Sequence, residues 1–301
     1  MPNHLLGELY ASLAAITWAF ALVLYRQSGE RVSPMALNLF KNVIGLVLLS
    51  LTLLYLGQGI NTLRVYPSRD LLILAISGVM GIALADTFFF HALNLIGVGL
   101  LSIVDCLYMP FVVCFSWLLL SEQLLLFHYL GGGLILLGVF VSSRHTPPAN
   151  RTRAQLVLGM LCAALALALM AFSVVVAKPV FERFPLTWAA QIRLLAGTAA
   201  LILLTLASGK RGEYWAVFRP AAIWKQSIPA SVLGMYFALL FWIAGFKYTQ
   251  ASIAAILNQT SVVFALILGT LILKEPFTRR KLVSVVLASA GTILAMLPSL
   301  L

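Results

Sequence analysis

Ten apolar segments, each long enough to cross a lipid bilayer as a helix, constrain this chain more than any other feature. A helix that crosses the hydrocarbon core needs about 20 mainly apolar residues, because lipid offers no partner to an unpaired backbone amide. The segments cover residues 5–27, 34–56, 70–91, 98–120, 125–142, 155–178, 186–208, 224–246, 250–273 and 279–298. They fill more than two thirds of the 301 residues. The sequence therefore predicts an all-α integral membrane protein with ten transmembrane helices.

The composition excludes a soluble protein. Only 10% of the residues are charged, whereas a soluble domain carries about 25%. The net charge of +11 could suggest a nucleic-acid partner, but most cations lie in short gaps between apolar segments, which is typical of topology control in a membrane. We expect the lipid bilayer as a partner and no nucleic acid. The first apolar segment lacks the features of a cleaved secretory signal, so we expect it to remain as a span.

The ten segments divide into two fives that are related by an internal repeat. Matched charges and glycines recur at one offset, which chance alignment of apolar helices does not produce. A shift of 152 residues pairs Gly7 with Gly159, Glu30 and Arg31 with Glu182 and Arg183, Lys41 with Arg193, and Gly45 with Gly197, and a shift of 153 pairs Asp105 with Asn258, Glu122 with Glu275, and Gly138 with Gly291. We predict two five-helix units, 1–145 and 146–301. Since five is odd, the second unit enters the membrane from the opposite side, and such an inverted repeat permits alternating access.

Four charged residues lie deep inside predicted spans, away from the span ends, where each costs roughly 3 kcal/mol or more. They are Lys41, Asp86, Asp105 and Arg193. At 1.5 Å per residue, the first three lie about 8 to 10 Å below one membrane surface. Lys41, Asp86 and Asp105 are therefore expected to form one layer. Arg193 and Asn258 lie at a similar depth from the opposite surface.

One cation beside two carboxylates leaves one acid uncompensated, and burial favours its protonated form. We expect Asp105 or Asp86 to take a proton from one side and exchange it for substrate. Lys41 would pair with the other acid or with a substrate carboxylate. Asp105 is the stronger candidate, because its repeat partner Asn258 is also polar. The alternative is that Lys41 and one Asp form an ion pair that only holds helices together.

Polar and aromatic side chains at similar depth could complete a binding pocket. Aromatic rings can stack on an organic substrate or its ammonium group, although buried aromatics also serve as plain packing. With Lys41 and Arg193, the candidates are Trp18, Asn38, Tyr108, Gln191, Tyr236, Trp242 and Asn258.

Other features receive structural interpretations. Glu122 and Glu275 end apolar segments and are expected to cap the following helix or bond the hairpin. The three cysteines lie inside apolar segments and the histidines are scattered, so we expect no disulfide, metal site or cofactor. No catalytic set is recognisable, so we do not expect an enzyme.

Two stretches carry a resemblance to a known family. Residues 88–140 contain FFFHALNLIGVG, SIVDCLYMPFVVCFSWLLLSEQL and GGGLILLGVF, and the second half repeats the pattern in FWIAGFKYTQASIAAILNQTSVVFALILGTLILKEPF. Both halves resemble the EamA-type repeat of the drug/metabolite transporter superfamily. The resemblance implies a fold of two inverted five-helix repeats and transport of a small-molecule substrate without ATP. It also implies that both termini face the cytoplasm, whereas 13 Lys and Arg after odd-numbered spans against five on the other side indicate the opposite orientation.

Together these observations predict a secondary transporter in the cell inner (plasma) membrane, either a monomer or a homodimer. Mixed charge in the site and the resemblance to amino-acid exporters favour export of a small zwitterionic metabolite such as an amino acid. A phosphorylated or nucleotide-linked anion is the alternative substrate, which would need more cations than Lys41 and Arg193. A membrane assembly or sensing protein without a transport cycle is the alternative from another class.

Overall fold

A computed structural model describes residues 3–29, 33–142, 152–209, 211–219, 224–272 and 279–300. Within these ranges the chain is helical and contains no strand. The α-helices are α1 (Asn3–Gly29), α2 (Pro34–Tyr55), α3 (Ser68–Gly78), α4 (Asp86–Val104), α5 (Tyr108–Leu120), α6 (Leu126–Ser142), α7 (Arg153–Arg183), α8 (Leu186–Ala207), α9 (Arg211–Trp215), α10 (Trp224–Ser231), α11 (Leu239–Tyr248), α12 (Ala251–Asn258), α13 (Ser261–Ile272) and α14 (Arg279–Leu300). Short 3-10 helices cover Ile60–Val65, Asp105–Leu107 and Ala216–Phe218.

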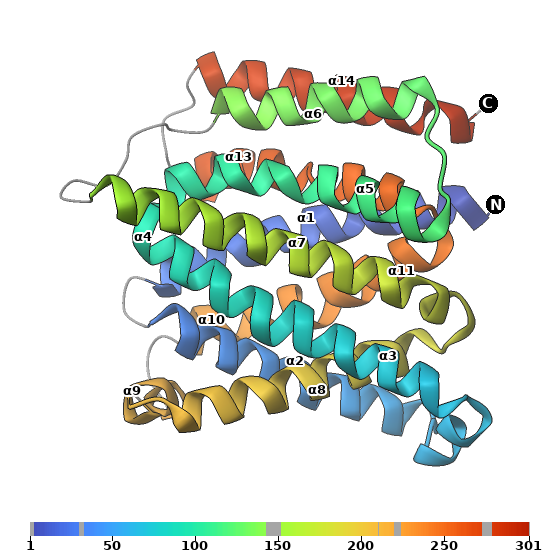
Figure 1. Ribbon diagram of the computed structural model, residues 1–301, viewed down its shortest axis with the longest axis vertical. Coiled ribbons are helices and arrows are strands. Elements are labelled where there is room, and N and C mark those ends of the chain that lie inside the picture. The colour runs from blue at the N-terminus through green and yellow to red at the C-terminus, as the bar shows by residue number, and fades with distance from the viewer. Residues whose placement is uncertain are drawn as a thin grey trace.

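Seven helical stretches in the described part of the chain are long and apolar enough to cross a membrane, and three shorter apolar helices accompany them. The shorter ones are Asp105–Leu120, Leu126–Val141 and Leu282–Pro298. The protein is thus a multi-pass membrane protein. Both ends of the described chain lie at the same end of the helix bundle, which we call the terminal face (Figure 1).

Two spans contain a π-helical turn at repeat-related positions. Val79–Ala85 links α3 to α4, and Val232–Ala238 links α10 to α11. The two turns are 153 residues apart, which is the offset found in the sequence. π-Helical turns are rare and are frequently found at functional sites. The duplicated sequence therefore has a duplicated irregularity in its backbone.

A second pair of interruptions falls on Asp105 and Asn258. The 3-10 turn Asp105–Leu107 precedes α5, while α12 ends at Asn258 and α13 begins at Ser261. The 153-residue offset again relates the two breaks. The expected connection near residues 92–97 has helical backbone within α4. The chain nevertheless reverses along α7, since Gly81 lies against Ser173, Ile96 against Gly159 and Phe115 again against Phe172.

Close helix contacts repeat at the same offset. A β-carbon on Gly7 would lie 2.5 Å from the Thr249 nitrogen, and one on Gly159 would lie 2.4 Å from Ile96. Adding 152 to Gly7 gives Gly159, and subtracting 153 from Thr249 gives Ile96, so the internal repeat relates the two contacts. At such distances only glycine lets the backbones approach.

Helices α6 and α14 form an outer pair beside the remaining bundle (Figure 1). Gly131 lies against Gly291, whereas Gly138 lies against Ser284, so the two helices run antiparallel. Adding 153 to Gly131 gives Ser284, and subtracting 153 from Gly291 gives Gly138, so the repeat maps each contact onto the other. A pair with this property has a local twofold axis perpendicular to its helices.

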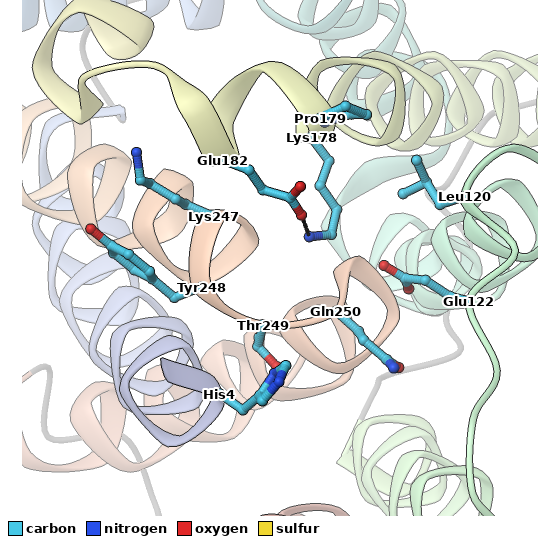
Figure 2. Close-up of a pocket in the computed structure, with 10 residues that line it drawn as sticks. All are labelled: His4, Leu120, Glu122, Lys178, Pro179, Glu182, Lys247, Tyr248, Thr249 and Gln250. Carbon is cyan, nitrogen blue, oxygen red and sulfur yellow. Dashed lines mark hydrogen bonds and ion pairs between the residues drawn. The ribbon is translucent and has the colours of Figure 1, made fainter. Parts of the chain in front are cut away.

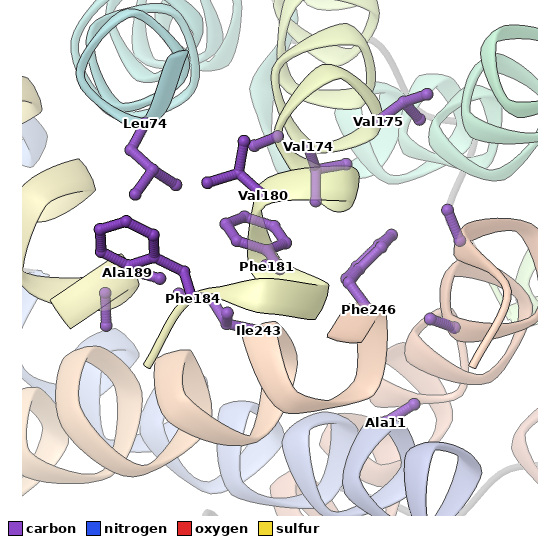
Figure 3. Close-up of a cluster of buried hydrophobic side chains, with 14 of the residues drawn as sticks. Ala11, Leu74, Val174, Val175, Val180, Phe181, Phe184, Ala189, Ile243 and Phe246 are labelled. Carbon is purple, nitrogen blue, oxygen red and sulfur yellow. The ribbon is translucent and has the colours of Figure 1, made fainter. Parts of the chain in front are cut away.

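The main apolar core surrounds the end of α7. Val174, Val180 and Phe181 pack with Leu74 of α3 and Phe246 of α11 (Figure 3). The core therefore joins residues from both halves of the chain. Helix α7 is the element around which the two halves meet.

Candidate functional site

Lys41 and Asp86 form an ion pair inside the bundle. Their Nζ and Oδ2 atoms are 3.7 Å apart, and the side chains are 12% and 19% exposed. The Lys41 ammonium also lies 5.7 Å from the centre of the Trp18 ring. Asn38 is buried next to Asp86 and accepts a hydrogen bond from Asn42. Helices α1, α2 and α4 thus bring four of the predicted site residues together.

Arg193 occupies a separate cluster on α8. It is 1% exposed, and its Nη1 donates a hydrogen bond to the Ser77 hydroxyl. Its guanidinium carbon lies 5.3 Å from the Phe181 ring centre and 5.5 Å from that of Trp242. Tyr108 is its electrostatic neighbour. Arg193, Trp242 and Tyr108 therefore share one environment.

Asp105 lies at the helical break before α5. Its neighbouring polar groups are Gln259, Cys106 and Tyr108. The Gln259 amide is buried, and its Nε2 has no partner at hydrogen-bond distance among the described residues. The expected layer of one cation with two carboxylates is therefore divided, because Lys41 pairs with Asp86 while Asp105 faces Gln259.

The other predicted residues occupy interhelix positions. Gln191 donates to Ser50 at 2.9 Å, and the Tyr236 hydroxyl is 2.7 Å from that of Thr52. Both bonds connect the second half of the chain to α2. Asn258 has a buried Nδ2 without a hydrogen bond in the described part of the chain.

Glu122 caps a helix, but not the one expected from the sequence. Its carboxylate accepts hydrogen bonds from the backbone nitrogens of Ala251 and Ser252 at 2.7 and 3.0 Å, and from the Ser252 hydroxyl at 2.8 Å. The capped helix is α12, in the opposite half, rather than α6 or the adjoining hairpin. At the start of α6, the Leu125 nitrogen instead donates to His128. Glu275 lies outside the described residues.

The terminal face carries further polar contacts that sequence reasoning did not single out. Arg183 donates two hydrogen bonds to the buried Asp70, at 2.6 and 2.8 Å. Thr187 donates to Gln58 at 2.7 Å. Each contact joins the two halves of the chain. Asp70 begins the predicted segment 70–91, and Arg183 lies in the gap between 155–178 and 186–208, where charges are common and indicate no particular role.

A pocket of about 560 Å³ opens at the same end (Figure 2). Its lining includes Glu122, Lys178, Glu182 and Lys247. Lys178 and Glu182 form an ion pair at 2.6 Å, and Lys247 donates to the Phe184 carbonyl at 2.6 Å. The pocket therefore contains both signs of charge, with much of it satisfied by the protein itself.

A multi-pass bundle with charged side chains inside its spans, duplicated helix breaks and a polar pocket at one face defines the class of membrane transport proteins. A model of the EamA-like transporter family matches residues 5–144 and 157–297. An uncharacterized transporter from Archaeoglobus fulgidus is 25% identical over 299 residues, covering 97% of this chain and 99% of that protein. A crystal structure with 22% sequence identity has the same fold, with a TM-score of 0.79 over 97% of this chain and 96% of the other.

The chain belongs to the EamA-like transporter family. It is a membrane transporter whose two halves each match the family repeat. Among the described residues, no three His, Cys, Asp or Glu side chains form a group that could hold a metal ion.

Proposed function

We propose that the protein is a secondary transporter with ten spans, arranged as two inverted five-helix repeats within 1–145 and 146–301. The observation that carries this proposal is the set of irregularities repeated at one offset, namely the two π-helical turns and the breaks at Asp105 and Asn258. Broken helices near the middle of a repeat fold are typical of transporter binding sites. The antiparallel symmetry of α6 and α14 supports the inversion.

We propose that the cargo is a small zwitterionic metabolite such as an amino acid, exported across the inner (plasma) membrane. The interior holds both signs of charge, and Asp86 neutralises Lys41. A phosphorylated substrate would need several free cations, so this pairing favours a zwitterion. The candidate contacts are the polar and aromatic residues around Lys41–Asp86 and Arg193.

We propose that Asp105 carries the coupled proton. Its carboxylate lies in a helical break, with Gln259, Cys106 and Tyr108 as polar neighbours and without a cation in direct contact in the described part of the chain. A carboxylate without a permanent counter-ion can exchange a proton as its exposure changes. Asp86 is the weaker candidate, because its ion pair with Lys41 stabilises the ionised carboxylate.

Flux measurements in reconstituted vesicles test the proposed cargo and the proposed proton-coupling role of Asp105. We expect exchange of a labelled amino acid across vesicles that contain the purified protein, with net export that increases with the proton gradient. Asp105→Asn should keep exchange between equal pools but remove the dependence on the gradient. Glu213→Gln, which removes an exposed carboxylate on α9, is the matched control. No flux of any tested metabolite would support an assembly or sensing role instead.

A further inference from the structure

Arg193 is a cation inside the membrane bundle for which the described part of the chain supplies no carboxylate. Its guanidinium is 1% exposed, and its polar contact is the Ser77 hydroxyl. The salt bridges among the described residues involve Lys41, Lys178 and Arg183 instead. A charge buried in a span is costly unless an opposite charge accompanies it. The missing anion therefore requires an explanation.

The internal repeat shows where that anion would lie. Arg193 corresponds to Lys41, whose counter-ion is Asp86. The residue that corresponds to Asp86 in the second half is Leu239, at an offset of 153. Trp242 follows Leu239 by about one helical turn on α11 and contacts the Arg193 guanidinium, so this stretch of α11 borders the cation. The second half keeps the cation but lacks its acid.

One edge of the Arg193 guanidinium is free. Nη1 donates a hydrogen bond to Ser77, whereas the buried Nε has no hydrogen-bond partner among the described residues. Beside Nη2 lies Gly81, on which a β-carbon would be 3.4 Å away. The Nε and Nη2 hydrogens point along the same edge, and this pair of parallel donors matches the two oxygens of a carboxylate. The nearby Tyr108 hydroxyl is also buried and accepts or donates no hydrogen bond in the part of the chain that the structure describes.

We propose that the free edge of Arg193 binds the carboxylate of the transported substrate. The inference rests on the proposed transport function and deepens it, because it makes a carboxylate the group that every good cargo must carry. The ligand would supply in the second half the negative charge that Asp86 supplies in the first. Phe181 and Trp242 would provide apolar walls beside that carboxylate.

Thermal unfolding of the full-length protein in detergent tests the site with benzoate as the probe. Benzoate should raise the midpoint temperature, whereas benzamide and benzylamine at equal ionic strength should not. Arg193→Lys keeps the charge but loses the paired donors, so the benzoate Kd should rise at least about tenfold. Arg193→Gln should remove the response. Arg280→Gln, which removes an exposed cation at the start of α14, should retain it.

A gain-of-charge variant keeps the test decisive if changes at Arg193 prevent folding. Leu239→Asp should supply the missing acid, raise the midpoint of the ligand-free protein and remove the benzoate response. Leu239→Asn has a similar size without the charge and should keep that response. A full benzoate response in Leu239→Asp or Arg193→Gln would overturn the inference, as would stabilisation by benzamide equal to that by benzoate.

The flux measurements separate this inference from the proposed function. Amino-acid flux in vesicles without benzoate stabilisation would overturn the carboxylate site and leave transport standing. Benzoate stabilisation that depends on Arg193, without flux of any cargo, would support the carboxylate site and overturn the proposed transport function.

Discussion

At the scale of single residues, the Lys41–Asp86 pair shows how an intramembrane charge is tolerated. The two side chains come from α2 and α4, and each reduces the cost of burying the other. Sequence reasoning selected both residues because ionisable groups are rare inside spans. It could not assign their partners, because depth along a helix does not define which helices are neighbours.

Removal of one member of this pair should be more harmful than removal of both. Lys41→Met leaves Asp86 without its cation, and we expect a loss of about 2 to 4 kcal/mol in unfolding free energy. The double variant with Asp86→Asn should recover much of that loss. Unfolding titrations in mixed micelles measure all three variants. A double-variant loss equal to the sum of the losses in Lys41→Met and Asp86→Asn would show that the pair contributes no coupling.

At the scale of helices, the contact between Glu122 and α12 satisfies a helix end with a side chain from the other half. A carboxylate at a helix N-terminus accepts unpaired backbone donors and interacts favourably with the helix dipole. Glu122→Ala should therefore lower unfolding free energy by about 1 to 2 kcal/mol. The exposed neighbour Gln123→Ala should have little effect. A comparable loss in both variants, measured by the same titration, would contradict the capping role.

The α6–α14 pair depends on close approach at Gly131. A β-carbon there would lie 2.6 Å from the Gly291 carbonyl oxygen, whereas one on Gly133 would meet nothing within 4 Å. Gly131→Ala should cost about 1 to 3 kcal/mol through helix separation. Gly133→Ala on the same helix is the matched control and should be neutral or slightly stabilising. Thermal midpoints of the two variants provide the comparison.

The repeat and the helical class could be read from the sequence because apolar length and matched residues determine them directly. The π-helical turns could not, since Val79–Ala85 and Val232–Ala238 have no composition that separates them from ordinary helix. Likewise, Lys41 and Arg193 were selected by their charge, but their division into two clusters depends on how α2 and α8 pack. Glu122 was expected to cap the following helix or bond the hairpin, but the backbone nitrogen that it caps lies 129 residues away.

At the scale of the whole molecule, the two ends of the bundle are chemically unequal. Asp70–Arg183, Gln58–Thr187 and Glu122–Ser252 all join the two halves at the terminal face. The repeat partner of Asp70 falls at 222 or 223, where the sequence has Ala and Ile. The Asp70–Arg183 contact, which has two hydrogen bonds, therefore lacks a repeat-related acid at the other end of the bundle. It should favour closure of the terminal face.

Loss of that ion pair should open the terminal face more often. In a chain whose native cysteines are replaced by Ala, Thr249→Cys places a thiol at a pocket residue that is 2% exposed. Arg183→Gln should then increase its rate of labelling by a polar maleimide at least about fivefold. Arg280→Gln, at an exposed cation at the start of α14, is the control. An unchanged rate would show that Asp70–Arg183 does not control access.

The Glu122 contact also bears on how the protein is made. Synthesis reaches Glu122 more than a hundred residues before the backbone amides of Ala251 and Ser252 that it accepts. Until the second half is inserted, the Glu122 carboxylate therefore lacks the two backbone donors that it has in the complete fold. Separate expression of the two halves should yield a stable product only when both are present in the same membrane.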